Sequence, residues 1–425
     1  MQLCFFSDVE GQRFDPLTLT RPVEDLRVGI LTVQDKWERW LHLTTKARIC
    51  RPYLTPLYNN STIQPDHDCL WINARFLPDH SLTEQLKSLL TGQALIYSSA
   101  KHDGAEAEST ELVAVVLSGQ QSLDCLLKCE HINDPAHWVQ TLFGASDSSK
   151  RYPEKAKKLD YLWDILQFNS SEIEADLGLI SLPSVEEHNL RSNLYVMHTE
   201  QILVHPSAHL EPGVILVAED GPIYIGAGAT IEAGSILKGP LAICEGAVTK
   251  MGCRIYGGTT IGPVSKVGGE VFNTIFHSYS NKAHDGYMGN SLVGQWCNMG
   301  ADSNTSNLKT NYGRIYLEDW NTRQAYDIGF QFFGSVLGDH SKTAINAMLN
   351  TGTMCGVCSN IFLSKFTPKH IPSFSWLTDA GNSTYRFDKA VEAMKAMMVR
   401  RDIELEAGYQ SMMKHLFDQA TLNDR

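Results

Sequence analysis

The sequence lacks the features that mark membrane, exported and nucleic-acid-binding proteins. No apolar run approaches the roughly 18 residues that a membrane-spanning helix needs. The first residues, MQLCFFSDVEGQRF, contain no basic segment followed by an apolar one, so they do not resemble an export signal. Lysine and arginine number 36 against 48 aspartates and glutamates, and the formal net charge of −12 would repel nucleic acid. We therefore expect a cytoplasmic protein that binds neither a membrane nor nucleic acid.

The cysteines are unremarkable in number and lack a metal-binding pattern. The ten cysteines include no pair of CxxC motifs and no Cys/His set of the kind that holds zinc. The single CxxC motif, Cys355 to Cys358, lies among small apolar residues, which favours packing over a redox or metal role. The sequence therefore predicts buried, reduced thiols and no metal site.

The first part of the chain has the pattern of an α/β domain. At 425 residues the chain exceeds what one hydrophobic core usually holds, so more than one domain is expected. Apolar runs such as DCLWINARFL and ELVAVVLSG alternate with amphipathic segments such as VQDKWERWL and SLTEQLKSLL. We predict a sheet domain over residues 1–190, ending in a helical connector from about Tyr152.

The next part repeats an apolar residue every six positions. One short strand and one tight turn take about six residues, and three such repeats close one coil of a triangular prism. The pattern therefore predicts a parallel β-helix over residues 191–375. The residues in register are Ile225, Ile231, Leu237, Ile243, Thr249, Ile255, Ile261 and Val267, then Leu337, Thr343, Leu349, Cys355 and Ile361, with a shorter stretch at Val293 and Met299.

Two segments depart from this period. Between about residues 306 and 334 the sequence turns polar and aromatic, which predicts a loop inserted into one coil, and solenoid insertions often lie on the binding face. From residue 376 to 425 apolar residues recur three or four positions apart, which predicts a helical C-terminal extension.

The segment NKAHDGYMGNSLVGQWCNMGADSNTSNL resembles a known enzyme family. Its residues fit the acetyltransferase motif of the bacterial bifunctional N-acetylglucosamine-1-phosphate uridylyltransferase/glucosamine-1-phosphate acetyltransferases without a gap. The resemblance implies a left-handed β-helix, a homotrimer and acetyl-CoA as co-substrate. The matching residues are His284, Tyr287, Gly289, Asn290, Asn298, Gly300, Ala301 and Asn307.

The resemblance also implies roles for these side chains. His284 would be the catalytic base, and Asn307 would lie near the catalytic centre with the acyl donor. Tyr287 and Asn298 would hold the sugar. Arg254 stands where the family keeps an arginine for the sugar phosphate.

Residues near the motif match the family at some positions and differ from it at others. Glu270 matches, but Phe272 replaces a phosphate-binding lysine, which leaves the acceptor open. On the coil after the inserted loop, His340 and Lys342 are basic candidates for contacts with the CoA phosphates.

The N-terminal part resembles the nucleotidyltransferase domain of the same family through DVEGQRFDPLTLTRPVEDL. In the family this loop cradles phosphates, and here Gly11, Arg13 and Arg21 are the candidate nucleotide-binding residues. Val9 and Val23 replace a glycine and a lysine of the family. Nucleotidyl transfer needs Mg²⁺ held by carboxylates, and the sequence shows no clear carboxylate ligand for it.

These patterns predict an acyl-CoA-dependent N-acetyltransferase acting on an amino-sugar phosphate. Its sugar-nucleotidyltransferase-like domain would use UTP or dTTP, with Mg²⁺, in the synthesis of a nucleotide sugar. Two alternatives stay open. In the first, the chain would be a sugar-nucleotide-binding regulator whose sites have decayed. In the second, nucleotidyl transfer would be its main activity.

Overall fold

In the computed structural model the chain divides into two units, described over residues 1–58, 61–99, 109–180, 182 and 193–422. The N-terminal unit comprises Met1–Phe14, Arg21–Leu26 and Leu31–Tyr161. The C-terminal unit comprises Asp15–Thr20, Arg27–Ile30 and Leu162–Arg425. The domain limit predicted at residues 190 and 191 lies outside the described residues.

The N-terminal unit is built on a six-stranded mixed sheet with the order β2-β1-β3-β5-β4-β6. Strand β1 pairs in parallel with β2 on one side and with β3 on the other, while β3 and β4 both pair antiparallel with β5. The strands are β1 (Gln2–Phe6), β2 (Thr45–Ile49), β3 (Cys69–Asn73), β4 (Gln93–Ser99), β5 (Ser109–Leu117) and β6 (Ser148–Arg151).

Helices cover this sheet where the sequence alternation predicted them, so the predicted α/β class is confirmed. Thr32 and Asp35 form a capping box that starts the first helix. Trp138 and Leu142 of a later helix pack into the same buried cluster as Phe6 and Trp71 of the strands. The helices are α1 (Val33–Leu41), α2 (Thr55–Tyr58), α3 (His80–Lys87), α4 (Gly119–Cys129) and α5 (Pro135–Gly144).

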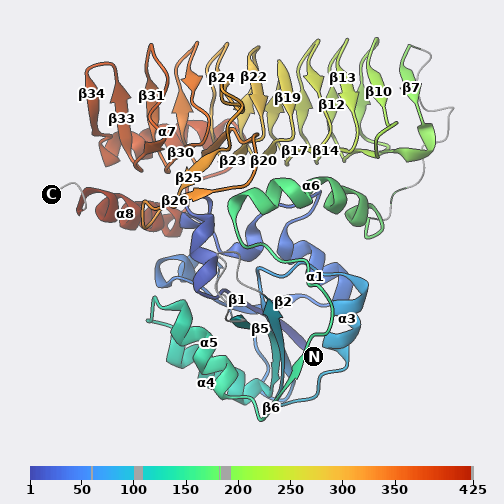
Figure 1. Ribbon diagram of the computed structural model, residues 1–425, viewed down its shortest axis with the longest axis vertical. Coiled ribbons are helices and arrows are strands. Elements are labelled where there is room, and N and C mark those ends of the chain that lie inside the picture. Colours follow the sequence, from blue (N-terminus) through green and yellow to red (C-terminus); the bar gives the residue numbers. More distant parts are fainter. Residues whose placement is uncertain (59–60, 100–108, 181, 183–192, 423–425) are drawn as a thin grey trace. The chain divides into compact units, whose positions relative to one another are not determined.

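The C-terminal unit is a parallel β-solenoid with three faces, and its strands follow one another in chain order (Figure 1). The first face holds β7 (Tyr195–Met197), β10 (Ile215–Val217), β13 (Ile236–Lys238), β16 (Arg254–Ile255), β19 (Glu270–Phe272) and β22 (Tyr287–Gly289). The second face holds β8 (Ile202–Val204), β11 (Ile223–Ile225), β14 (Leu241–Ile243), β17 (Thr259–Ile261), β20 (Ile275–Ser278), β23 (Leu292–Gln295), β27 (Ser335–Leu337), β30 (Thr353–Cys355) and β32 (His370–Ile371).

The third face is formed by two groups of strands. The first group is β9 (His209–Leu210), β12 (Thr230–Ile231), β15 (Val248–Thr249), β18 (Lys266–Val267) and β21 (Asn281–Lys282). The second group is β28 (Lys342–Thr343), β31 (Asn360–Phe362), β33 (Ser375–Thr378) and β34 (Gly381–Thr384). Asn298 bridges the two groups by pairing with Asn281 and with Lys342.

The residues of the six-residue period form the core of the solenoid, as predicted. From Ile225 to Val267 each member of the series is at most 1% exposed. Consecutive coils stack their inward residues directly, for example Leu237 on Ile255. Each coil therefore buries its apolar residues only on its neighbours, which is how a solenoid is stabilised. The left-handedness that the resemblance implies stays a prediction.

The corner between the second and third faces turns through the left-handed backbone region. Tyr279, Trp296 and His340 occupy this corner on successive coils with φ between 57° and 60°. Non-glycine residues rarely adopt this conformation, so the coil stacking must hold them there. As a result the rings of Tyr279 and Trp296 stack with centroids 4.3 Å apart.

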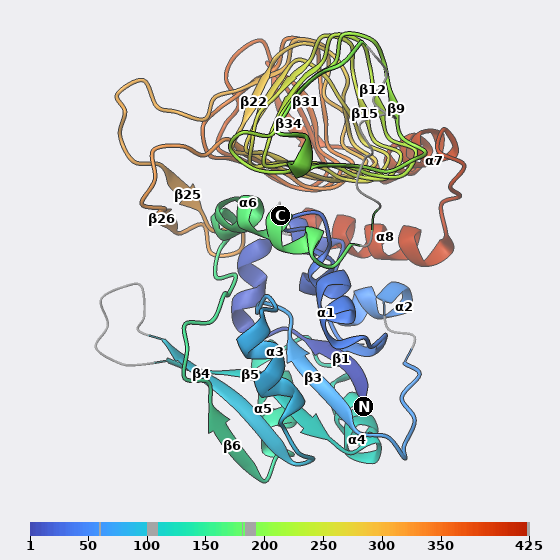
Figure 2. The same cartoon turned by 90° about the vertical axis from the view of Figure 1, so that its right-hand side faces the viewer.

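The C-terminal unit also contains a hairpin and helices outside the three faces. Between β24 (Asn304–Thr305) and β27 the chain forms an antiparallel hairpin of β25 (Tyr316–Glu318) and β26 (Ala325–Asp327), and the chain rejoins the β24 side at β29 (Met348–Leu349). Helix α6 (Leu162–Leu177) packs on β14 and β17. Helices α7 (Phe387–Val399) and α8 (Ala407–Leu422) complete the unit (Figure 2). No helix of the described residues combines the length and apolarity needed to cross a membrane.

Two short N-terminal segments belong to the C-terminal unit rather than to the sheet domain. The Thr20 hydroxyl donates to Asp339 at 2.8 Å, and the Asn321 amide of the hairpin turn donates to Asp15 at 3.1 Å. Residues Asp15–Thr20, which belong to the segment that resembles the phosphate-binding region of the family, therefore pack on the solenoid.

Candidate functional site

A hydrogen-bonded cluster on the first face joins three residues of the motif. The Asn307 amide donates to the Tyr287 hydroxyl at 3.0 Å and to Oδ1 of Asn290 at 2.8 Å. Burial raises the pKa of Tyr287, so its hydroxyl keeps its proton. A side chain at Gly289 would collide with the cluster, because a Cβ there would lie 2.3 Å from the Tyr287 hydroxyl. This glycine of the motif is therefore required by close packing.

Arg254 and Glu270 continue this cluster along the face. The register pairs Arg254 with Glu270 and Glu270 with Tyr287 on consecutive coils. The Arg254 guanidinium lies 3.2 Å from the Glu270 carboxylate, and both side chains are well exposed. Such a pair stabilises the fold little, so Arg254 can exchange Glu270 for a phosphate at small cost.

His284 lies at the corner between the third and first faces, in the turn from β21 to β22. Its side chain is exposed, and no residue of the described part of the chain hydrogen-bonds its imidazole. Its backbone carbonyl, in contrast, accepts a hydrogen bond from the Lys282 ammonium at 3.0 Å. The turn is thus fixed while the imidazole stays available for a substrate.

Lys282 is a residue of this site whose buried position the sequence did not predict. It stacks on Val267 at an inward position of the solenoid, and its ammonium also donates to the Gly268 carbonyl at 3.2 Å. Burial lowers the pKa of Lys282 to about 8, against the opposing charges of Asp285 and Asp302. The coil between Val267 and Lys282 is shorter than three repeats of six residues. The six-residue period therefore does not mark position 282 as inward.

Of the remaining predicted residues, Asn298 and Lys342 lie on the third face, and His340 lies at the corner between the second and third faces. Asn298 is partly buried between Asn281 and Lys342. Lys342 is partly exposed, and its ammonium donates to the carbonyl of His340 at 3.0 Å. The His340 side chain is fully buried, with Nε2 3.0 Å from the Tyr409 hydroxyl. The predicted set is therefore divided between two faces that meet at His284.

A cavity of about 490 Å³ adjoins the first-face cluster through Asn290. This volume is in the usual range for a small-molecule site. Its single arginine, Arg314, stems from the inserted hairpin region and lies 3.4 Å from Asp327. Phe272, which replaces the lysine of the family, packs edge-on against Tyr256. The cavity is lined by Trp163, Leu166, Gln167, Asn273, Asn290, Arg314 and residues 329–333.

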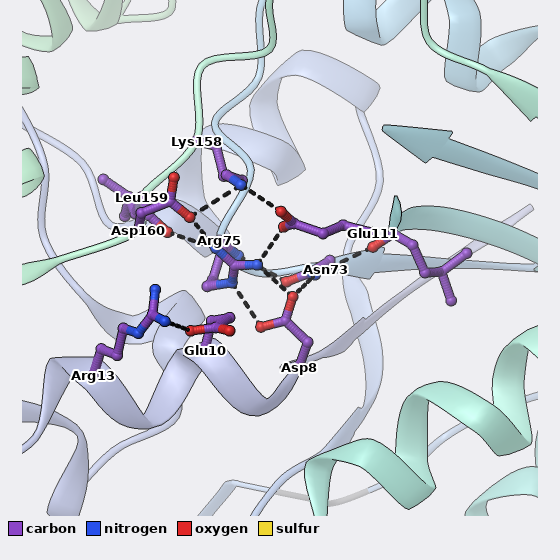
Figure 3. Close-up of polar contacts among 10 residues, drawn as sticks. Asp8, Glu10, Arg13, Asn73, Arg75, Glu111, Lys158, Leu159 and Asp160 are labelled. Carbon is purple, nitrogen blue, oxygen red and sulfur yellow. Dashed lines mark hydrogen bonds and ion pairs between the residues drawn. The ribbon is translucent and has the colours of Figure 1, made fainter. Parts of the chain in front are cut away.

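The N-terminal unit has its own candidate site at the point where the strand order reverses. The chain places β2 on one side of β1 and β3 on the other, and ligands of α/β sheets bind beyond the strand ends at such a point. Asp8 follows β1 there, and Asn73 ends β3. Figure 3 shows both side chains pointing toward Arg75.

Arg75 is fully buried and binds three carboxylates. Its guanidinium donates to Asp8 at 2.6 Å, to Asp160 at 2.6 Å and to Glu111 (Figure 3). The ammonium of Lys158 adds contacts with Glu111 at 2.6 Å and with Asp160 at 3.0 Å. Burial alone would raise the pKa of Asp8, but the charge of Arg75 outweighs it and the pKa lies below its ordinary value.

The Mg²⁺ ion that the family resemblance implies does not fit this cluster. Its three carboxylates already surround a buried guanidinium, so a cation would have to displace Arg75. No group of three or more His, Cys, Asp or Glu side chains suited to a metal occurs in the part of the chain that the structure describes.

The three candidate nucleotide-binding residues lie beside this cluster or are buried. Gly11 is buried against Ser7 and Val23, so packing alone requires its small size. Arg13 pairs with Glu10 at 2.5 Å and lies over the ring of Tyr161. Arg21 is only 1% exposed. Of the three, Arg13 alone presents a side chain with appreciable exposure.

Comparisons with known proteins find a match for the N-terminal part. Residues 3–183 match the family model described as sugar nucleotidyl transferase. No protein of curated function matches the sequence significantly.

One similar solved structure is a variant of the perosamine N-acetyltransferase of Caulobacter crescentus in complex with CoA and GDP-perosamine. It is 14% identical, with a TM-score of 0.16, and the match covers 43% of this chain. The match spans 55% of that chain, about half its length, and at this score it says nothing about the site. The chain therefore carries a transferase domain of the sugar nucleotidyl transferase type over residues 3–183, followed by a parallel β-solenoid and C-terminal helices.

Proposed function

We propose that the solenoid transfers an acetyl group from acetyl-CoA to the amine of an amino-sugar phosphate. The observation that carries the proposal is the contact of Asn307 with Tyr287, because these residues are twenty positions apart and the motif assigned both to one site. His284 lies in the turn that leads into the strand of Tyr287. The short connection from His284 to Tyr287, with the contact of Tyr287 and Asn307, supports one site that combines a base with two hydrogen-bonding groups.

The chemistry requires a neutral amine to attack the thioester carbonyl. The His284 imidazole removes the amine proton as the N–C bond forms, since an imidazole can both accept and release a proton in such a reaction. A backbone N–H of a solenoid turn stabilises the oxyanion. The C–S bond then breaks, and the proton held by His284 passes to the departing thiolate of CoA.

The cavity beside Asn290 supplies groups for the acceptor. Asn273 and Asn290 offer amides for sugar hydroxyls, and Arg314 offers a charge for the phosphate in place of the lysine that Phe272 replaces. Arg254 supplies a second guanidinium on the same face of the solenoid. The homotrimer implied by the resemblance is part of this proposal.

For the N-terminal unit we propose the binding of a sugar nucleotide at the switch point beside Arg75. The match of residues 3–183 to the sugar nucleotidyl transferase family supports this class of ligand. Release of pyrophosphate from UTP or dTTP with a sugar phosphate, with and without Mg²⁺, tests whether the unit also turns the nucleotide over.

Thiol release from acetyl-CoA in the presence of glucosamine-1-phosphate and related amino-sugar phosphates tests the proposed acetyl transfer. We expect release with the wild-type protein and a fall in kcat of about 100-fold or more for His284→Ala. His209→Ala is the matched control, because His209 is an exposed solenoid histidine far from the motif. Equal rates for both variants would remove His284 from the mechanism.

A further inference from the structure

A second cavity, on the third face, carries a concentration of positive charge that the proposed acetyl transfer does not use. Its volume is about 470 Å³. The sequence MMVRRD at the end of α7 contributes Arg400 and Arg401, and β18 contributes Lys266. The other lining residues are Tyr279, Asn281, Ala283, Trp296, Asn298, Ala396 and Met397.

The three cations of this cavity have no carboxylate partner among the residues that the structure describes. Burial and the charges of Arg401, Lys250 and Arg400 lower the pKa of Lys266, and Glu232 opposes them only in part. The C-terminal end of α7 offsets some of this repulsion through its dipole. The remaining positive charge favours an anionic ligand.

The guanidinium of Arg401 is oriented by the protein, but not all of its N–H donors have a hydrogen-bond acceptor. Its Nη2 donates to the Asn281 side chain at 3.1 Å, which fixes the plane of the guanidinium. Its Nε lies buried without a hydrogen-bond partner in the described chain. A buried unpaired donor costs free energy, so a small shift of the Arg401 side chain that lets Nε donate to a ligand oxygen would be favourable.

We propose that this cavity binds the diphosphate group of a nucleotide. A guanidinium fork matches two phosphate oxygens, and two adjacent arginines with a lysine match the charge of a diphosphate. The volume of the cavity exceeds what a lone diphosphate needs, and the aromatic and amide lining of Tyr279 and Asn298 suits the attached nucleoside. The cavity shares Asn298 with the acceptor site proposed above, but its arginines and its lysine have no role in the proposed acetyl transfer.

Calorimetric titration of the full chain tests this site with ADP, UDP, CoA and inorganic pyrophosphate as ligands and adenosine as a control without phosphate. We expect dissociation constants below about 1 mM for at least one diphosphate and no binding of adenosine. Arg400→Gln and Arg401→Gln should each weaken binding about tenfold. Arg386→Gln should not, because Arg386 is exposed and paired with Asp388 away from the cavity.

The ligand series also identifies the source of the diphosphate. Tighter binding of CoA than of ADP would assign the cavity to the acyl donor, and tighter binding of ADP or UDP would assign it to a separate nucleotide. Failure of every diphosphate to bind, or equal binding by Arg401→Gln and the wild type, would overturn the proposal. So would a change of oligomeric state in the variants without ligand binding, because the cavity would then be covered by a second copy.

Discussion

At the scale of single residues, the buried lysine beneath His284 has the clearest physical consequence. Lys282 is a cation inside a hydrophobic prism, and it is held there by two carbonyl oxygens, one of them that of His284. A buried charge contributes little stability compared with an apolar residue of similar size. Its presence therefore points to a role in positioning the turn that carries His284, the proposed catalytic base.

We predict that Lys282→Met keeps or raises stability but lowers the acetyl-transfer kcat about tenfold, because the His284 turn loses its anchor. The pKa of about 8 lies below the ordinary 10.5, so the wild type gains stability as pH rises from about 8 to 10.5. The gain should approach about 3 kcal/mol, and the variant should lack it. Urea unfolding at several pH values measures this difference.

Lys250→Met is the control for that experiment, because Lys250 is partly exposed and paired with Glu232. A pH dependence that is the same in Lys282→Met and the wild type would contradict the assigned pKa. An unchanged kcat would contradict the positioning role.

Arg75 gives a second prediction at this scale. Arg75→Ala leaves three carboxylates facing one another with only Lys158 to balance two of them, and we expect a loss of about 3–5 kcal/mol in the stability of the N-terminal unit. Because the freed carboxylates are hard oxygen ligands, Mn²⁺ should raise the melting temperature of this variant but not of the wild type.

Thermal unfolding with and without Mn²⁺ checks the prediction for Arg75. Arg13→Ala serves as the control, since its ion pair with Glu10 is partly exposed and should be worth less than about 1 kcal/mol. Stabilisation of the wild type by Mn²⁺ that Asp8→Asn abolishes would show that the cluster accepts a metal after all.

At the scale of elements, the solenoid owes its stability to the stacked inward residues of its coils. Neighbouring residues of β13 provide a test, since Leu237 is fully buried and Ile236 is 40% exposed. We predict that Leu237→Ala costs about 2–5 kcal/mol and Ile236→Ala less than about 1 kcal/mol. Similar losses of unfolding free energy for the two variants in urea would contradict the assignment of Leu237 to the core.

The sequence predicts these elements well where the repeat is regular and poorly where it is not. Leu237 stacks on Ile255 eighteen residues later, which is three repeats of six. Val267, in contrast, stacks on Lys282 only fifteen residues later, so a fixed period places the inward residue wrongly. The shortening falls on the coil before the turn that carries His284, because Val271 follows Val267 after four residues and Phe276 follows Val271 after five.

At the scale of the whole molecule, the chain combines a transferase domain with a solenoid that holds its own candidate site. The order of the two could be predicted from strand and helix alternation followed by a six-residue period. The assignment of Asp15–Thr20 to the C-terminal unit could not, because the contact of Thr20 with Asp339 joins residues 319 positions apart. Arg314 was missed for the same reason, since its place in the cavity beside Asn290 depends on how the inserted hairpin folds.

The division of the predicted site between two faces also appears only at this scale. Tyr287 and Asn307 meet on the first face, whereas Asn298 lies on the third, with His284 at the corner between them. A substrate that touches all four must therefore span the corner. Such a substrate would place its amine at the imidazole, which is what acetyl transfer requires.

Identification of the acetylated product tests this account most directly. The protein is incubated with acetyl-CoA and glucosamine-1-phosphate, and mass spectrometry follows the N-acetylated sugar phosphate together with free CoA. We predict product and CoA in equal amounts with the wild type and His209→Ala, and neither above background with His284→Ala. Free CoA without acetylated sugar, or undiminished product from His284→Ala, would contradict acetyl transfer at His284.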